Sequence, residues 1–487
     1  MDSVAEHLAT AERAVAIAGD AGATYADARI LDQGTERLRV RNREIEAVVS
    51  STSTGVGIRV IADGCWGFAA VGNLGATEVE AAARKAVSVA RAGAVLRAAP
   101  VRLADTAPVR ADWRTPVEED PFAVALEDKL DLLVRATEAM LAGGEVSIAE
   151  ASFDAWRRAS LFVSSEGAAI TQHITQCGAG IEATVVGESE VQNRSYPNSF
   201  GGDYGSAGFE FVRGLDLVGH ADRVADEAAR LLAADECPAD VTTLVLDGSQ
   251  VALQVHESIG HPIELDRVLR MEAAFAGTSF LTPGDRGSLR YGSPALNVAA
   301  DATTPGALGT FGYDDEGVPA GVTPVITDGV FQGFLSSRET AAEIGLDRSS
   351  GTVRAQSWEH LPLIRMTNIN LLPGAASSLD EMLDGVRSGV YLETNRSWSI
   401  DDRRVDFQFG TEWGREIKDG RLGRVLRNGT YAGRTRDFWG SLDLVGGPGL
   451  WRPWGLPNCG KGQPGQIGYV AHGAAPARFR DVRVGVR

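Results

Sequence analysis

The chain lacks the features that mark nucleic-acid-binding, membrane and secreted proteins. Its 47 basic side chains are outnumbered by 65 acidic ones, and the net charge of −18 argues against nucleic acid as a direct partner, because phosphate binding needs a basic surface. No window contains the ~18 consecutive apolar residues of a membrane span. Met1–Glu6 show no basic region followed by an apolar stretch. We therefore expect a cytoplasmic protein that binds neither nucleic acid nor membrane.

Cysteine is also scarce. The four cysteines include no Cys-x-x-Cys pair, which argues against a structural zinc finger and against a disulfide framework. Cys65, Cys177 and Cys237 lie in apolar, strand-like or loop surroundings and are interpreted as buried small side chains. Repeats of solenoid period, low-complexity tracts and heptad runs are not evident either.

The length of the chain, 487 residues, exceeds the size at which a single hydrophobic core stops growing, so two or more domains are expected. Polar residues and a proline at 235–239 separate a predicted helix from a predicted strand. We place the boundary there, with an N-terminal α+β domain over residues 1–236 and a C-terminal β-rich domain over residues 237–487. The predicted fold class is α+β.

Hydrophobic spacing divides the first part into helices and strands. Apolar positions at helical spacing predict helices over residues 3–19, 78–91, 120–141 and 217–234. Alternating apolar residues from Ala26 to Val71, with the turn dipeptide Asp63-Gly64, predict a β-meander, and more strands are expected over residues 146–186. The first part is therefore predicted to be a mixed α/β layer.

The second part is predicted to be mainly β. A strand is expected at residues 242–246, and strand-like runs follow at residues 363–371 and 390–393. The dipeptides Asp328-Gly329 and Asp419-Gly420 are typical of hairpin turns.

The most informative segment is His256–His261, with the sequence His-Glu-Ser-Ile-Gly-His. Zinc peptidases use the shorter pattern His-Glu-x-x-His, in which both histidines share one helical face. Here the second histidine comes one residue later, which turns it roughly 140° away from the first in a regular helix. Gly260 and Pro262 favour local unwinding, and a wide π-type turn, which pairs residue i with i+5, would bring both rings together.

The helix that carries this segment has a clear start. Asp247 or Ser249 can cap it, and its apolar positions Val251, Val255 and Ile259 recur every four residues. Each histidine taken alone could equally be a polar residue with ordinary hydrogen bonds, so a third ligand is needed to support a metal site.

Cys459 is the candidate third ligand. It lies among Pro, Asn, Gly and Lys in what we expect to be a loop, where a thiol has no packing role and a nearby cation would favour the thiolate. Two histidines and one thiolate leave the fourth tetrahedral position free, as in catalytic zinc sites.

These residues resemble the TldD/PmbA family of intracellular metallopeptidases. The resemblance rests on the His256–His261 motif, on Cys459-Gly460-Lys461, on Phe409-Gly410-Thr411-Glu412 and on the overall layout, and it covers nearly the full length. It implies His256, His261 and Cys459 as ligands of one Zn2+ ion per active chain and Glu257 as the catalytic base. The PmbA (TldE) branch lacks the His-Glu motif, so the chain is similar to the active TldD branch. The segment Gln463–Arg487 departs from the better-known members.

The resemblance implies zinc-dependent hydrolysis of short or unfolded peptides, in a dimer with a PmbA/TldE-like paralogue or with a second copy of the chain. Zinc-activated water would attack the peptide while Glu257 accepts the proton. A zinc amidase of the peptide-deformylase type and a non-catalytic regulatory subunit of a TldD/PmbA complex remain as alternatives. A gyrase-linked regulator fits the acidic charge poorly.

Four further features stay open at this point. Residues 277–297, rich in glycine and proline, could form a mobile lid or an irregular surface loop. His173, in a strand-like run, is interpreted as structural. His472 lies close enough to Cys459 in sequence to assist the site, and Glu412 is considered as a hydrogen-bond partner for a ligand imidazole.

Overall fold

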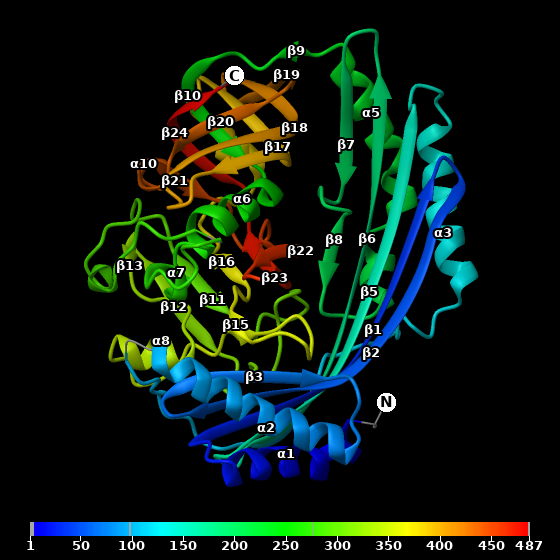
Figure 1. Cartoon of the computed structure of the whole chain (residues 1–487). Coiled ribbons are helices and arrows are strands. Elements are labelled where there is room, and N and C mark those ends of the chain that lie inside the picture. Colours follow the sequence, from blue (N-terminus) through cyan, green and yellow to red (C-terminus); the bar gives the residue numbers. More distant parts are fainter. Residues whose placement is uncertain (1–3, 97–98, 276, 486–487) are drawn as a thin grey trace.

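The computed structural model describes residues 4–96, 99–275 and 277–485. It is a mixed α/β protein with a β-rich C-terminal part, as predicted. Two large sheets lie beside each other, the first built by the blue to green half of the chain and the second by the green to red half (Figure 1). Residue 3 of the first predicted helix and residues 486–487 of the C-terminal segment lie outside the described residues.

The first sheet is dominated by very long antiparallel strands. Its strand order is β3-β2-β1-β5-β6-β4, and β7 and β8 also pair with β6. The β1–β2–β3 part is the predicted meander, and Asp63 and Gly64 form its tight turn with positive φ angles of 50° and 71°. The strands are β1 (Tyr25–Arg41), β2 (Glu44–Ala62), β3 (Cys65–Val71), β4 (Arg110–Arg114), β5 (Ile148–Ser164), β6 (Ala169–Val186), β7 (Val191–Tyr196) and β8 (Asp203–Gly205).

Two pairs of helices cover this sheet: α1 (Leu8–Asp20) packs with α2 (Ala76–Gly93), and α3 (Leu126–Leu141) packs with α5 (Leu217–Leu232). Close packing depends on small residues, since a Cβ atom on Gly67 of β3 would lie 2.1 Å from the Ala86 carbonyl oxygen of α2. One predicted helix begins later than expected, at Leu126 rather than residue 120, because Asp120 accepts from the backbone N–H of Phe122 and forms a turn around Pro121. The helical elements are η1 (Ala5–His7), α1 (Leu8–Asp20), α2 (Ala76–Gly93), η2 (Ala94–Leu96), α3 (Leu126–Leu141), α4 (Phe209–Gly214) and α5 (Leu217–Leu232).

The second sheet has the order β17-β10-β24-β20-β18-β19-β9, with β21 on β24, and a further β17–β18 pairing closes five of its strands into a ring. Aromatic side chains such as Phe409, Tyr431 and Phe479 fill the core beside it. Asp419-Gly420 forms the predicted β18–β19 turn. The strands are β9 (Asp235–Glu236), β10 (Asp240–Leu246), β17 (Ser388–Ile400), β18 (Asp406–Lys418), β19 (Arg421–Arg427), β20 (Thr430–Arg434), β21 (Leu442–Val445) and β24 (Ala477–Val484).

Smaller elements surround the helix that follows β10. The strand-like run at 363–371 is divided, because Arg365 and Asn368 pair with other segments between β15 and β16. The remaining strands are β11 (Val298–Asp301), β12 (Val322–Thr327), β13 (Val330–Phe331), β14 (Val353–Arg354), β15 (Leu363–Ile364), β16 (Ile369–Leu371), β22 (Arg452–Lys461) and β23 (Gln466–Ala474). The helical elements are α6 (Gly248–Val255), η3 (His256–Gly260), α7 (Leu265–Val268), η4 (Pro283–Asp285), α8 (Arg338–Glu343), α9 (Leu379–Leu383) and α10 (Thr435–Gly440).

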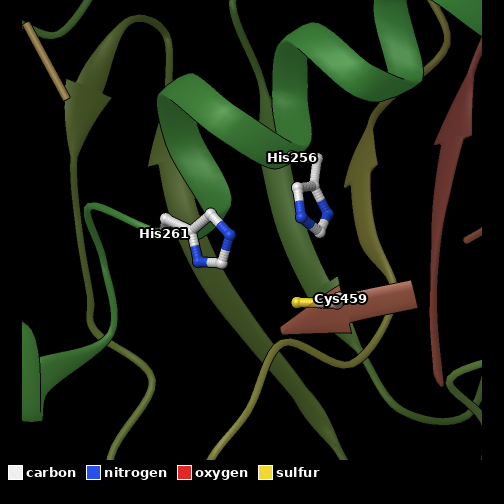
Figure 2. A group of neighbouring side chains, drawn as sticks. All are labelled: His256, His261 and Cys459. Atoms are coloured by element: carbon white, nitrogen blue, oxygen red, sulfur yellow. The ribbon is translucent and has the colours of Figure 1, made fainter. Parts of the chain in front are cut away.

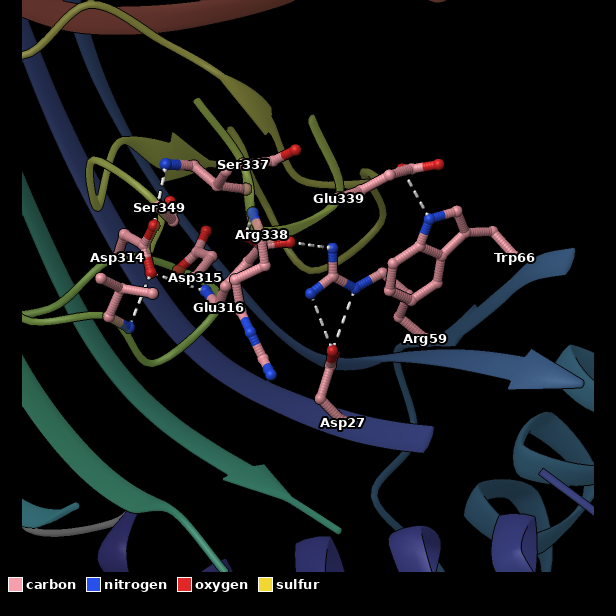
Figure 3. Close-up of polar contacts among 12 residues, drawn as sticks. Asp27, Arg59, Trp66, Asp314, Asp315, Glu316, Ser337, Arg338, Glu339 and Ser349 are labelled. Carbon is pink, nitrogen blue, oxygen red and sulfur yellow. Dashed lines mark hydrogen bonds and ion pairs between the residues drawn. The ribbon is translucent and has the colours of Figure 1, made fainter. Parts of the chain in front are cut away.

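Buried ion pairs join the first sheet to the loop that follows β11. We call them the Asp315 cluster, which consists of Asp27, Arg29, Arg59, Arg158, Asp315 and Glu316. Arg59 on β2 donates to Asp27 at 2.9 Å and to Glu316 at 3.1 Å, and Figure 3 shows the guanidinium directed at the Asp27 carboxylate. Three guanidinium groups therefore face three carboxylates in this cluster.

No helix among the described residues has the length and apolar character that crossing a bilayer requires.

Candidate metal centre

The metal centre begins with the cap of α6. Asp247 is the N-cap residue, and its carboxylate accepts from the backbone N–H groups of Ser249 at 2.8 Å and Gln250 at 3.1 Å. The helix runs without a break into the wide turn η3, in which the His261 N–H donates to the His256 carbonyl oxygen at 3.1 Å. This bond joins residue i to i+5, so the predicted π-type turn is confirmed.

Buried contacts from other segments hold the wide turn. A Cβ atom at Gly260 would lie 2.0 Å from the sulfur of Met366, so any larger residue here would force the Met366 side chain to move. Ser258 is buried, and its hydroxyl accepts from Trp439 Nε1 at 2.9 Å while its carbonyl accepts from the Tyr291 hydroxyl. The Ser258 carbonyl within the widened turn is therefore paired.

The structure brings His256, His261 and Cys459 together. One ligand atom from each lies within 4.8 Å of the others, and all three side chains are buried. Figure 2 shows the two imidazoles projecting from the wide turn toward the Cys459 sulfur on the strand below. Their rings are 4.7 Å apart and nearly perpendicular. Two imidazole nitrogens and one sulfur form the donor set that suits Zn2+.

Cys459 lies on a strand, so the expectation of a loop was wrong. It belongs to β22 and pairs with Gly468, next to an irregularity in register between Leu456 and Cys459. Burial alone would raise the pKa of its thiol, but the nearby Arg365 guanidinium, with His261 beside it, outweighs burial and lowers that pKa. The cation that favours the thiolate is thus Arg365, not the neighbouring Lys461.

Both candidate histidine ligands are held in their neutral form. Burial lowers the pKa of His256 and of His261 to about 4. A neutral imidazole has one bare nitrogen that can bind a metal ion. The partner of the other nitrogen then decides which atom remains bare.

A carboxylate orients His261. Its Nδ1 lies 3.0 Å from Glu264 Oε2, and Glu264 also accepts from Arg267 Nε at 2.7 Å and lies 3.3 Å from Lys461 Nζ. Burial alone would raise the pKa of Glu264, but Lys461 and Arg267 hold it well below the usual range. The ionised carboxylate only accepts, so His261 Nδ1 donates and Nε2 stays bare.

His472 lies behind His256. It is fully buried on β23, and its Nε2 is 2.8 Å from His256 Nδ1. Its own Nδ1 is 3.1 Å from the Ile369 carbonyl oxygen. Burial lowers the pKa of His472 well below its usual value, so this ring is also neutral.

Glu257 faces the same cavity as the three candidate ligands. The cavity has a volume of about 360 Å3, and apolar side chains including Phe200, Trp398 and Leu456 form part of its wall. Glu257 Oε2 accepts from Arg404 Nη1 at 2.6 Å. Arg404 also lines a neighbouring cavity that shares Gly460, so the two hollows adjoin beside Glu257.

Three of the open features do not line the cavity. Glu412 accepts from the Ser195 N–H at 2.7 Å and from the Ser195 hydroxyl at 2.8 Å rather than from a ligand imidazole, so the idea that it orients one of them was wrong. Residues 277–297 do not supply any of the cavity's lining residues, and their Tyr291 packs in the core instead. His173 lies within β6, as expected for a structural residue.

Sequence reasoning missed most of the polar residues around the ligands. Glu264 follows His261 by three positions, a spacing that a search for orienting carboxylates could have found. Arg365 and Arg404 gave no such signal, because each reaches the site from a distant segment.

Family comparisons cover most of the chain. The description "PmbA/TldA metallopeptidase C-terminal domain" matches residues 239–485, the central domain of that family matches residues 119–234, and its domain 1 matches residues 26–90.

Curated relatives carry metalloprotease names. A metalloprotease of Methanothermobacter thermautotrophicus is 29% identical over 461 residues, which is 95% of this chain and 95% of that protein. A metalloprotease of Methanocaldococcus jannaschii is 28% identical over 422 residues, or 86% and 89% of the two chains. A zinc metalloprotease TldD homolog of Saccharolobus solfataricus is 26% identical over 247 residues, or 50% and 51%.

Solved structures share the fold. TldE from Thermococcus kodakarensis matches with a TM-score of 0.73 at 15% identity, covering 98% of this chain and 99% of that one. A candidate modulator of a DNA gyrase from Thermotoga maritima matches with a TM-score of 0.75 at 18% identity, covering 98% and 99%.

Proposed function

Because this chain belongs to the PmbA/TldD metallopeptidase family, we propose that it is a zinc-dependent peptidase with the metal held by His256, His261 and Cys459 and with Glu257 as general base. The observation that carries the proposal is the convergence of two neutral imidazoles and one thiol, within 4.8 Å, beside a carboxylate in a cavity. Three protein donors leave one tetrahedral position for water or substrate, as catalytic zinc requires.

When bound there, zinc supplies Lewis-acid chemistry, which lowers the pKa of water and stabilises negative charge on a carbonyl oxygen. Glu257 accepts the proton that water loses as it attacks the scissile carbonyl, and then donates that proton to the leaving amine. Arg404 orients Glu257 by its bond to Oε2, which leaves Oε1 for proton transfer.

We assign short or unfolded peptides as substrates. A cavity of about 360 Å3 accommodates a few residues of extended chain but no folded domain. Its apolar wall, which includes Phe200, Trp398 and Leu456, favours contact with an apolar substrate side chain. The neighbouring hollow beyond Arg404 offers room for the chain on the other side of Glu257.

We further propose a dimer, with a TldE-like paralogue or with a second copy. The shared fold with TldE supports this partner class. In β2, the outer edge of residues 44–55 pairs with no other strand of the described chain, and Ile45, Val48 and Val49 are about half exposed there. Light scattering of the pure protein, alone and mixed with a co-expressed paralogue, tests the assembly.

The proposed activity is tested on the purified full chain. We expect about one zinc ion per active chain by elemental analysis, and loss of peptide cleavage on chelation with recovery on adding zinc. Cleavage should release new amino termini, whereas release of formate would identify a deformylase-type amidase. The unfolded form of one protein should be cut and its folded form should resist. A zinc-free chain that cleaves no peptide would favour the regulatory-subunit alternative.

A further inference from the structure

We propose that His472 is a positioning residue that fixes the tautomer of His256, so that His256 Nε2 is the atom presented to the metal. The inference rests on the proposed metal site and adds to it a residue outside the ligand set. The two ligand imidazoles are then oriented in different ways. A charged carboxylate, Glu264, orients His261, whereas a neutral imidazole, His472, orients His256 and is itself bonded to a backbone carbonyl; we call this pair of bonds the relay.

The relay begins at a backbone carbonyl. A carbonyl oxygen can only accept, so the contact of 3.1 Å between His472 Nδ1 and the Ile369 oxygen requires the proton to lie on Nδ1. The Nε2 atom of the neutral ring is then bare. It lies 2.8 Å from His256 Nδ1, which must therefore carry a proton and donate it. The remaining nitrogen of His256, Nε2, keeps its lone pair for the metal.

The backbone on both sides of His472 is hydrogen-bonded to the segment 367–370, which includes Ile369. The Gly473 N–H donates to Asn370 Oδ1 at 2.8 Å, and the Ala471 N–H donates to the Thr367 oxygen at 3.3 Å. The imidazole rings of His256 and His472 are nearly perpendicular, with centroids 4.9 Å apart. The ring of His472 is therefore placed by backbone hydrogen bonds of its neighbours, independently of any bound ion.

A neutral relay suits this position better than a carboxylate. The ionised Glu264 behind His261 is balanced by Arg267 and Lys461, which contact it directly. His472 contacts another imidazole and a carbonyl, and a buried anion there would lack such balancing cations. The His472–Ile369 pair orients His256 without burying a charge.

His472 is not itself placed as a ligand. The convergent group consists of His256, His261 and Cys459, and the Nε2 atom of His472 is engaged with the far side of the His256 ring. A ligand role would require that contact to break.

The test compares His472→Leu with His472→Gln. The leucine removes both hydrogen bonds, whereas the glutamine amide can accept from His256 Nδ1 through its oxygen and donate to the Ile369 carbonyl through its nitrogen. Zinc affinity is measured by competition with a chromophoric chelator. We expect His472→Leu to lower the affinity by about 10- to 100-fold, the usual effect of losing an orienting partner, and His472→Gln to remain within a few-fold of the unchanged protein.

Two further measurements keep the outcome decisive. The visible spectrum of the cobalt-substituted protein reports the ligand set, which should be the same in His472→Gln and in the unchanged chain. Nitrogen NMR of the unchanged, metal-free protein labelled at its seven histidines should show protons on Nδ1 of both His256 and His472, and needs no variant that folds poorly. Val470→Ala, a core truncation on the same strand, should lower stability but not zinc affinity.

The outcomes separate this inference from the proposed function. An unchanged protein that binds no zinc overturns the proposed function. Tight zinc binding by both the unchanged protein and His472→Leu overturns the relay alone, as does a proton on Nε2 of metal-free His256. Equal loss of affinity in both His472 variants, with an altered cobalt spectrum, would show that His472 is a ligand and would also overturn the relay.

Discussion

The metal centre at the end of α6 and the Asp315 cluster beside the first sheet are two of the places where buried titratable side chains gather. In the Asp315 cluster each carboxylate already contacts a guanidinium group, and Asp315 itself has two, Arg29 at 2.7 Å and Arg158 at 3.0 Å. Burial alone would raise the pKa of Asp315, but Arg158 and Arg29 lower it to about 2.

The metal centre is built differently. Its outer residues are paired, as Glu264 is with Arg267, but the inner atoms of His256, His261 and Cys459 point toward one another across a cavity. Neutral imidazoles beside a thiol have lone pairs left for a ligand, whereas the carboxylates of the Asp315 cluster are already matched by guanidinium groups. The difference is the one expected between a metal-binding site and a joint between two parts of a fold.

The largest expected effect comes from removing the thiolate. Cys459→Ser replaces it with a neutral hydroxyl, a far poorer zinc ligand, so we expect zinc affinity to fall at least about 100-fold and peptide cleavage to fall with it. Zinc content after dialysis and the rate of peptide cleavage are measured together. Cys177→Ser is the matched control, since Cys177 is buried in a different core. Unchanged zinc content in Cys459→Ser would remove Cys459 from the site.

The next effect separates the base from the ligands. Glu257→Gln keeps the size of the side chain but cannot accept a proton, so hydrolysis should fall at least about 100-fold while zinc content stays near normal. Glu264→Gln should instead weaken zinc binding, because it removes the charge that orients His261. Equal losses of zinc and activity in Glu257→Gln would mean that Glu257 binds the metal or supports folding.

A substitution in the Asp315 cluster should have a smaller effect on activity but a clear effect on stability. Asp315→Ala leaves Arg29 buried without its carboxylate, which typically costs about 3–5 kcal/mol. The thermal unfolding midpoint should fall by several degrees, while zinc affinity of the folded protein stays the same. Asp347→Ala, at an exposed position, should change stability little. A loss of zinc in Asp315→Ala would contradict the separation of the two regions.

The smallest expected effect is on the pH dependence of stability. Burial raises the pKa of Glu412 to about 7, above the ~4.3 of a free glutamate. Between these values the unfolded chain releases a proton that the folded chain keeps, so the stability from this group is full below pH ~4 and is lost as the pH rises through about 7. Glu412→Gln should flatten that part of the unfolding-midpoint profile without changing zinc affinity. A steeper profile, or a loss of zinc, would contradict this placement.

Much of the fold followed from local pattern. The helices of the first part, the β1–β3 meander and the Asp-Gly turns were predicted because spacing and turn residues act over a few positions. The division of the run at 363–371 was not, since it depends on Asn368 pairing with Ala471 in a distant strand. The same limit placed Cys459 in a loop, because its flanking glycine and proline conceal a strand that forms only against β23.

The sequence alone determined the kind of atoms offered to a metal and the need for a widened turn, because the spacing of His256 and His261, with Gly260 between them, fixes both locally. Tertiary structure decided which nitrogen of the His256 ring is free, because its partner His472 lies far along the chain. The partner of His256 is set by the pairing of β23 with β22 and by the bridge between Ala471 and Asn368, and a shift of one residue in that register would turn His472 to the opposite face. Such a register depends on contacts far apart along the chain, so the local sequence could not specify it.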